Sequence, residues 1–178
     1  MTDQQTFPDL DAADWGDEQS RTVTWHDPTE PARVGLSMAG IDYLRAMVAG
    51  RIPPPPISQL IQMDLVEVEP GRVVFTCTPD DSAYNPIGAV HGGLVCTLLD
   101  SVAGCALHST LPQGKGYTSV EIKVNYLKAV RASSGLLTAV GTVTKAGSRV
   151  GFTEGVVTDA SGAVVATATS TLLVFDLG

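Results

Sequence analysis

The sequence predicts an α+β fold in which an antiparallel sheet wraps around one long central helix, preceded by an extra N-terminal helical and acidic segment. One stretch, residues 92–110 (GGLVCTLLDSVAGCALHST), is mostly apolar and free of proline, which predicts a helix buried on most sides. Two strand-like segments precede it, and four segments rich in Val, Thr, Ile and Leu follow it. Consecutive strands around a single apolar helix favour an antiparallel sheet packed on that helix.

Three segments are expected along the chain. Residues 1–33 form an acidic, partly disordered lead, because they hold eight of the 19 acids and few apolar residues. Residues 34–56 form an N-terminal helix and a connector: apolar residues recur at near-helical spacing over 34–49, Gly50 closes the helix, and Pro53–Pro56 stop it. Residues 57–178 form the main domain.

The strands of the main domain are expected both before and after the central helix in the sequence. Residues 58–69 and 72–79 flank Pro70-Gly71, a hairpin signal. Four more are expected at 117–128, 135–147, 148–160 and 163–175, separated by Gly, Ser and Asp turns. In the first of these, apolar side chains alternate with polar ones. The apolar set is Val120, Ile122, Val124 and Tyr126, and the polar set is Ser119, Glu121, Lys123 and Asn125.

Composition narrows the class of protein. The chain has 178 residues, of which 44% are hydrophobic and 17% charged, enough for one globular domain with a core. It has no apolar run long enough to span a membrane and no N-terminal signal-peptide pattern, so we expect a cytoplasmic protein without a membrane partner. We interpret Cys77, Cys96 and Cys105 as buried, unpaired thiols in a reducing compartment, with a catalytic cysteine as the alternative.

Charge is unevenly distributed. The net charge is −8, and residues 1–31 hold eight acids and one base. Residues 115–149 hold six bases and one acid. The acidic total argues against a nucleic-acid partner, whereas the local basic segment fits either a small polyanionic ligand or an ordinary solvated surface.

Residues 85–100, NPIGAVHGGLVCTLLD, carry the candidate chemistry. The backbone N–H of Gly92, at the start of the predicted helix, has no intrahelical partner and lies at the positive end of the helix dipole, so it can donate to a carbonyl oxygen. Asp100 is the only carboxylate in the apolar stretch, where a charge is costly unless it is paired or functional. The alternatives are structural: Asp100 reaching solvent or capping a turn, the His91 ring bonding a backbone carbonyl beside the helix start, and Asn85 forming a turn before Pro86.

This motif resembles that of the hotdog-fold acyl-CoA thioesterases, and most closely that of their phenylacetate-pathway (PaaI-like) branch. Two later stretches are also similar to this family: the strand SVEIKVNYL and the closing hairpin RVGFTEGVVTDASGAVVATATSTL. The resemblance covers about residues 60–175. The resemblance implies hydrolysis of an acyl-CoA thioester without a cofactor or metal, with Asp100 as general base or nucleophile and the Gly92 amide polarising the carbonyl. It implies further roles for neighbouring residues. These are His91 in positioning, Asn85 holding the substrate carbonyl or the water, Gly93 and Thr118 at the substrate, and Ser119 holding the attacking water, with the choice between Thr118 and Ser119 open by one position.

Distance along the helix limits how the two main groups act. Gly92 and Asp100 are eight residues apart, which is ~12 Å along a helix at ~1.5 Å per residue. Asp100 therefore cannot comfortably attack a carbonyl held by Gly92 of the same helix. Either one group is not catalytic, or the site is assembled from two chains. The resemblance implies the second, a homodimer that often pairs again into a homotetramer.

The basic segment is then a candidate for the phosphates of coenzyme A. The candidate cations are Lys123, Lys128, Arg131, Lys145 and Arg149. Two other classes of function stay open: a non-catalytic acyl-CoA or fatty-acyl binding protein, and a hotdog-fold hydratase or dehydratase, for which His91 before two glycines is poorly placed. The acyl group is open among aryl, short-chain and medium-chain types, and the N-terminal helix with Pro53–Pro56 is a candidate cap over the acyl pocket.

Overall fold

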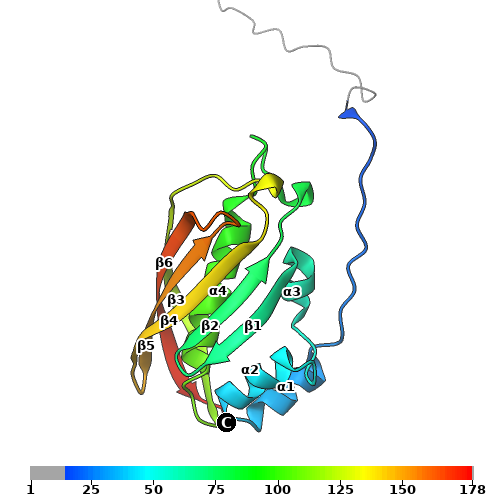
Figure 1. Ribbon diagram of the computed structural model, residues 1–178. Coiled ribbons are helices and arrows are strands. Elements are labelled where there is room, and N and C mark those ends of the chain that lie inside the picture. Colours follow the sequence, from blue (N-terminus) through cyan, green and yellow to red (C-terminus); the bar gives the residue numbers. More distant parts are fainter. Residues whose placement is uncertain (1–14, 178) are drawn as a thin grey trace, which may run out of the picture.

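The computed structural model describes residues 15–177, and it shows a six-stranded antiparallel sheet curved around one long helix, α4 (Gly92–His108) (Figure 1). The strand order is β1-β2-β4-β5-β6-β3, with every neighbouring pair antiparallel. The strands are β1 (Met63–Glu69), β2 (Arg72–Cys77), β3 (Lys115–Tyr126), β4 (Leu137–Ala146), β5 (Val150–Thr158) and β6 (Val164–Asp176). The predicted α+β class and the arrangement of sheet and central helix are confirmed.

The β1–β2 hairpin turns at Pro70-Gly71, as predicted. Gly71 has a φ of +76°, which a residue with a side chain rarely adopts, so the turn requires glycine. The strands before and after α4 then complete a single sheet, in which β2 pairs with β4 although α4 and β3 lie between them in sequence. This crossing leaves β3 at one edge of the sheet and β1 at the other.

Helix α4 is buried against the concave face of this sheet. It packs on β2, β3, β4, β5 and β6, and Leu98, Leu99 and Val102 are completely buried. The helix approaches the sheet so closely that a Cβ placed on Gly141 of β4 would lie 2.2 Å from the carbonyl oxygen of Val102. Glycine at this position lets helix and sheet meet, and the apolar contact between them forms the main core.

The N-terminal prediction of one helix over 34–49 is wrong. The structure has two helices, α1 (Thr29–Leu36) and α2 (Gly40–Val48). The chain turns between them because Gly40 docks on the end of α4: its N–H donates to the carbonyl of Leu111 at 3.0 Å, and a Cβ there would lie 1.9 Å from the carbonyl oxygen of His108. Tertiary contact at Gly40 therefore overrides the helical periodicity.

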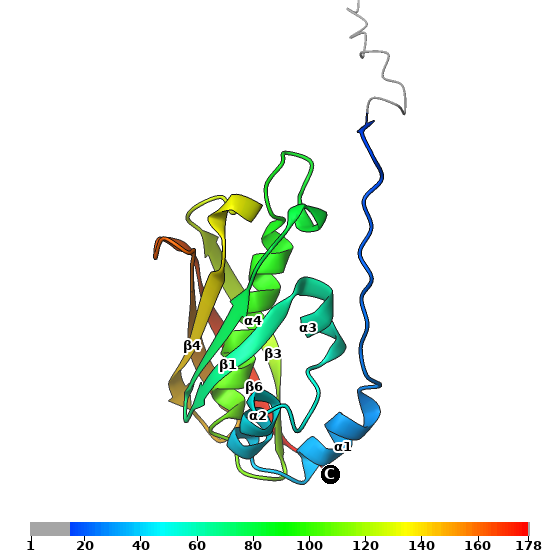
Figure 2. The ribbon, with the colours of Figure 1, turned by 45° about the vertical axis from the view of Figure 1, so that its right-hand side comes forward.

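A third short helix, α3 (Pro56–Ile61), was not predicted, because its residues were assigned to the first strand and the proline connector. Pro56 occupies the first helical position, where its missing N–H costs nothing. The acidic lead lies partly outside the described residues, since 1–14 are not described. Residues 15–28 run beside the domain, on the side of α3 (Figure 2). Arg21 holds them there by bonds to the Leu60 carbonyl at 2.8 Å and to Asp80.

Candidate active site

The N-terminus of α4 is capped by His91. The Gly93 N–H donates to His91 Nδ1 at 2.8 Å, so this ring nitrogen is an acceptor and the ring proton lies on Nε2. The structural alternative for His91, a ring that bonds backbone at the helix start, is thus observed, with an N–H in place of the expected carbonyl. Gly93, a candidate substrate contact, has its N–H occupied by this cap.

Asn85 shapes the loop that leads to this helix. Its Oδ1 accepts the N–H groups of Ile87 at 3.1 Å and Ala89 at 3.2 Å, and its own N–H donates to the Ala89 carbonyl. These bonds fold residues 85–89 into a tight turn, which is the structural alternative for this residue. The Asn85 oxygen is therefore occupied, whereas its NH₂ group has no hydrogen-bond partner within residues 15–177 and could contact a ligand.

The Gly92 N–H has no hydrogen-bond acceptor within residues 15–177. Its carbonyl accepts the Tyr126 hydroxyl at 2.9 Å, and a Cβ on Gly92 would lie 3.1 Å from the Tyr126 ring. Tyr126 thus ties the last residue of β3 to the start of α4. This contact was not predicted; from the sequence, Tyr126 was noted only as one of the alternating apolar residues of this strand.

Asp100 lies two turns further along α4, half-buried. Its Oδ1 accepts the Ser119 hydroxyl at 2.7 Å, and it forms no ion pair with any described residue. The five predicted catalytic residues therefore lie in two separate places. Asp100 contacts Ser119 in the middle of α4. Asn85 and His91 shape the chain around Gly92 at the N-terminus of this helix.

The register of β3 shows which neighbouring hydroxyl faces the helix. Ser119 pairs with Leu172, which is completely buried, whereas Thr118 pairs with Leu173, which is exposed. Directly opposed residues of antiparallel strands share a face, so Ser119 points inward and Thr118 points outward. The one-position ambiguity is thereby resolved in favour of Ser119 as the residue beside Asp100.

The alternation expected for β3 is wrong at its start. A β-bulge interrupts the pairing between Ser119 and Glu121, and Val120 is 59% exposed. Ser119 is three positions before Ile122 and seven before Tyr126, so in a regular strand it would lie on the face opposite to theirs. Because the bulge adds one residue to β3, Ser119 can face α4 as they do. The bulge is therefore what directs the Ser119 hydroxyl to Asp100.

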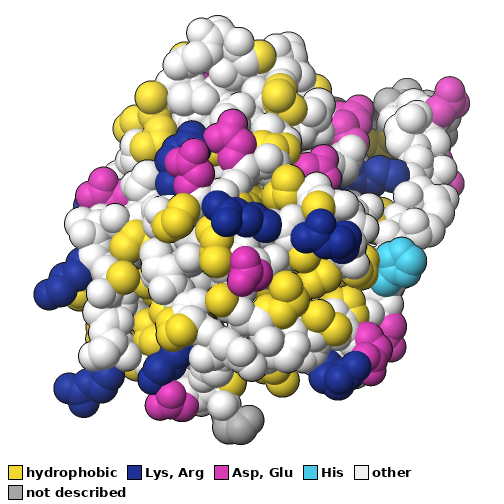
Figure 3. Space-filling view, turned by 60° about the horizontal axis from the view of Figure 1, so that its bottom comes forward, with side chains coloured by type: hydrophobic (Ala, Val, Ile, Leu, Met, Phe, Trp, Pro, Cys, Tyr) yellow, Lys and Arg dark blue, Asp and Glu magenta, His cyan; other side chains and the backbone are white. Residues whose placement is uncertain are grey.

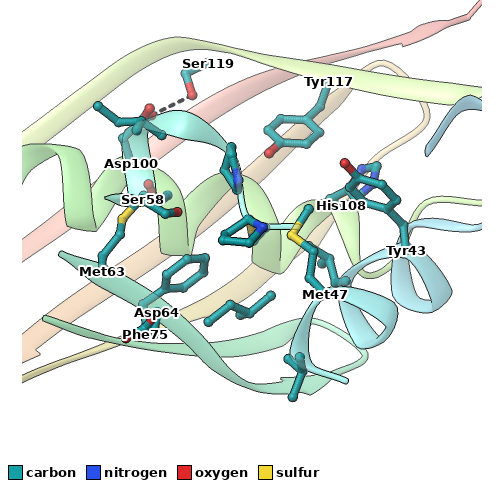
Figure 4. A pocket seen from close by; sticks show the side chains of 18 residues that line it. Tyr43, Met47, Ser58, Met63, Asp64, Phe75, Asp100, His108, Tyr117 and Ser119 are labelled. Carbon is teal, nitrogen blue, oxygen red and sulfur yellow. Dashed lines mark hydrogen bonds between the residues drawn. The ribbon is translucent and has the colours of Figure 1, made fainter. Parts of the chain in front are cut away.

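A cavity of about 600 Å³ extends from this carboxylate, within the size range of small-molecule sites. Asp100 and Ser119 lie at one end of it, and Tyr43 and His108 lie at the other, with Met47 and Phe75 between (Figure 4). The N-terminal helix and Pro53–Pro56 were expected as a cap over an acyl pocket, and Met47, Pro54 and Pro55 line this cavity. Most of its other lining residues, including Tyr43 and His108, were not identified from the sequence.

The cysteines are unpaired, as predicted, but only Cys77 is fully buried, and Cys96 and Cys105 are half-buried. Cys105 lines the cavity. Burial raises the pKa of the Cys105 thiol to about 12 and that of Cys77 to about 11. Both thiols are therefore protonated at neutral pH, which argues against the catalytic-cysteine alternative because the thiolate is the nucleophile.

The predicted basic residues do not form one cluster. Lys128 is paired with the buried carboxylate of Asp159 at 2.6 Å. Lys145 and Arg149 flank the β4–β5 turn, whereas Arg131 precedes β4, so the length of β4, ~25 Å or more at ~3.3 Å per residue, separates them. On the face in Figure 3, basic and acidic side chains are interspersed. Lys123, Arg131, Lys145 and Arg149 form no ion pair with residues 15–177.

Within residues 15–177, none of the helices is long and apolar enough to cross a membrane. In the same part of the chain, the possible metal ligands are also dispersed: no group of three or more His, Cys, Asp and Glu side chains is arranged to hold a metal ion.

Comparison with known proteins agrees with this arrangement. Residues 87–166 match the family model of the thioesterase superfamily. Human acyl-coenzyme A thioesterase 13 is 29% identical over 93 residues, which is 52% of this chain and 65% of that protein, so the match spans slightly less than two thirds of the relative.

Two solved structures extend the likeness to the whole domain. A Streptococcus mutans protein, solved bound to acetyl CoA, is 30% identical, with a TM-score of 0.59 over 64% of this chain and 89% of that one. A thioesterase-like, phenylacetic acid degradation-related protein of Ralstonia eutropha is 26% identical, with a TM-score of 0.67 over 74% of this chain and 98% of that one. The chain therefore belongs to the thioesterase superfamily of hotdog-fold proteins, as its Asn-Pro-x-Gly-x-x-His-Gly-Gly motif and spaced aspartate predict.

Proposed function

We propose that this protein hydrolyses the thioester bond of an acyl-CoA to a free acid and coenzyme A, with Asp100 as the catalytic carboxylate. The observation that carries the proposal is the Asp100–Ser119 hydrogen bond at one end of an apolar cavity. A half-buried carboxylate with no ion-pair partner among the described residues, beside space for an acyl group, is arranged to act on water or on the thioester carbon.

The two oxygens of Asp100 have different roles in this proposal. Oδ1 is held by Ser119, which fixes the orientation of the carboxylate. The other oxygen is left to accept a proton from water as a general base, or to attack the carbonyl carbon and form an anhydride that water then cleaves. In either case negative charge develops on the thioester oxygen and needs a hydrogen-bond donor.

The Gly92 N–H is the proposed donor, but it must come from a second chain. Helix α4 starts at Gly92, so the eight residues to Asp100 span ~12 Å within one protomer. Strand β3 lies at the edge of the sheet, where a second copy can pair with it. A homodimer with two equal sites follows if the pairing brings the two groups together.

The contacts of β3 support such a pairing. Ser119 touches Asp100, and Tyr126, seven residues later, touches Gly92. If two β3 strands pair antiparallel about the midpoint between these residues, Ser119 of one protomer lies opposite Tyr126 of the partner subunit. Each Asp100 then lies beside Gly92 of the partner subunit.

Pairing of two dimers into a homotetramer is proposed from the family resemblance. The outer face of the sheet carries exposed apolar side chains that are available for this contact: Phe152, Val156, Leu173 and Phe175.

Arg131 is the proposed first contact for the phosphates of coenzyme A. Its neighbours connect it to the Gly92 end of α4, since the Val130 carbonyl accepts the Val90 N–H and the Ala132 N–H donates to the Tyr84 hydroxyl. It has no ion-pair partner among the described residues, and its guanidinium suits bidentate phosphate contacts. Lys128, already paired with Asp159, is a weaker candidate.

The deciding experiment measures thiol release from a panel of acyl-CoA substrates by wild type, Asp100→Asn and Asp64→Asn. Asp64 is a matched control because it is the second carboxylate that lines the cavity. We expect Asp100→Asn to lose about 10²- to 10⁴-fold in kcat, the usual contribution of a general base, and Asp64→Asn to lose little. Full activity in Asp100→Asn would reject Asp100 as catalytic. Tight acyl-CoA binding without turnover by wild type would favour the non-catalytic binding protein instead.

A further inference from the structure

One wall of the cavity is built by a segment that precedes the thioesterase match. Helix α2 contributes Tyr43, Leu44, Met47 and Val48, whose spacing places them on one face of a helix. Pro54, Pro55 and Ser58, in the connector and α3, also line the cavity. All of these residues lie outside the matched residues 87–166, so this wall is an addition to the part of the chain that identifies the family.

Three rings close the end of the cavity furthest from Asp100. The rings of Tyr43 and His108 are 6.0 Å apart in an edge-to-face arrangement, and those of His108 and Tyr117 are 5.4 Å apart. Burial lowers the pKa of His108, so this end is uncharged at neutral pH. Gly40 fixes the position of α2 against α4, since any side chain there would collide with the His108 carbonyl. The end wall is therefore uncharged at neutral pH, and the close approach at Gly40 fixes the place of α2 in it.

The length of the cavity follows from α4. Asp100 and His108 lie at its two ends and are eight residues apart on this helix, which is ~12 Å. An extended alkyl chain with carbon–carbon bonds of ~1.5 Å advances about 1.3 Å per carbon, so it covers this distance with about eight to ten carbons. A longer chain meets the rings of Tyr43 and His108.

We propose that this cavity is the acyl pocket, that the protein takes straight medium-chain acyl groups of up to about ten carbons, and that the N-terminal segment, chiefly Tyr43 and Met47, sets this limit. The inference rests on the proposed function for the position of the thioester carbon at Asp100. It adds the class of acyl group and assigns its selection to residues 40–58, which lie outside the family match.

The test is a chain-length profile. The kcat/KM of wild type should rise about fourfold per methylene, from ~0.8 kcal/mol for each buried methylene, and should stop rising at eight to ten carbons. Met47→Trp fills the middle of the cavity and should lower kcat/KM for decanoyl-CoA at least tenfold while changing that for butyryl-CoA less than twofold. Arg45→Trp is the matched control, because it adds the same ring to the exposed side of α2 and should leave the profile unchanged.

A second variant tests the opposite direction. Tyr43→Ala opens the end wall and should move the optimum to dodecanoyl- or tetradecanoyl-CoA, a gain of function that an unfolded protein cannot give. Circular dichroism of each variant monitors folding. A wild-type profile that keeps rising to sixteen carbons, or a limit that neither variant moves, would overturn the inference.

Calorimetric binding of the same acyl-CoA series separates this inference from the proposed function. If wild type binds with a limit near ten carbons that Met47→Trp shortens, yet releases no thiol, the pocket stands and the catalytic proposal fails. If wild type releases thiol with no dependence on chain length in any variant, the catalytic proposal stands and the pocket assignment fails.

Discussion

Ser119 donates a 2.7 Å hydrogen bond to the carboxylate of Asp100 and so joins the edge strand β3 to the middle of the central helix. The contact depends on the bulge at Val120, without which the serine would face away from the helix. Within residues 15–177 Asp100 has no ion pair, and this bond is its one hydrogen bond to a side chain.

Replacing Ser119 tests whether this contact orients Asp100. Ser119→Ala should lower kcat about tenfold or more, because a hydrogen bond to a charged group contributes ~1.5–3 kcal/mol, while KM changes little. Thr118→Ala removes a hydroxyl from the outer face of the same strand and should leave kcat unchanged. Steady-state kinetics on both variants provide the check, and equal losses in the two would contradict the assigned register.

A mixed dimer tests whether the site is shared between chains. Gly92→Pro removes the proposed donor N–H at the first position of a helix, which proline tolerates, and His91 already has a ψ of 131° that suits a following proline. We expect it to lose about 10²- to 10³-fold in kcat. Gly92→Ala keeps the N–H and adds a Cβ near Tyr126, so it controls for crowding.

Neither Gly92→Pro nor Asp100→Asn should be active alone, but mixed dimers contain one site with both groups intact. Random assembly of equal amounts makes half of the dimers mixed, each with one of two sites complete, so about one quarter of wild-type activity should return. The readout is activity after co-refolding, with mixed dimers verified by differential tags. Verified mixed dimers without activity would place both groups in one chain.

His91 is expected to act on stability through its cap. His91→Ala leaves the Gly93 N–H without a partner and should lower the free energy of unfolding by ~1 kcal/mol, the usual cost of losing an N-cap, while kcat falls less than tenfold. His91→Asn supplies another cap acceptor and should restore most of the stability. Urea unfolding measures the first effect. A loss of kcat as large as that of Asp100→Asn, unrestored in His91→Asn, would instead indicate a base.

Asp159 is expected to make stability sensitive to acid. The bonds from Lys128 and Ser161 hold the pKa of this carboxyl well below its usual value. A carboxyl with a depressed pKa in the folded state stabilises the protein above the unfolded pKa of ~3.9, and this contribution is lost as the pH falls below that value. Asp159→Asn should therefore be less stable than wild type at pH 7, and the difference should shrink between about pH 5 and 2.

Thermal unfolding of wild type and Asp159→Asn across this pH range measures that difference. Asp176→Asn is a control, because it removes an exposed carboxylate paired with Lys115, and exposed pairs contribute little. A difference between wild type and Asp159→Asn that stays constant down to pH 2 would contradict the proposed role of the ionised carboxylate.

Several elements could be predicted from the sequence because their signals are local. The apolar, proline-free stretch predicted α4, Pro70-Gly71 predicted the hairpin, and the Val- and Thr-rich segments predicted the later strands within a few residues. The elements that were missed depend on distant contacts. The break before Gly40 follows from its docking on His108, and α3 replaces part of an expected strand.

The sequence by itself determined that a carboxylate and a helix N-terminus with a free amide lie on one helix, too far apart to act on the same atom, since helix rise depends only on residue number. The tertiary structure alone decided which side chains surround them. It placed Ser119 at Asp100 through a bulge, used Asn85 and His91 to build the helix start, and brought α2 over the cavity. These outcomes depend on strand register and on the packing of segments far apart in the chain, and neither is encoded in a local pattern.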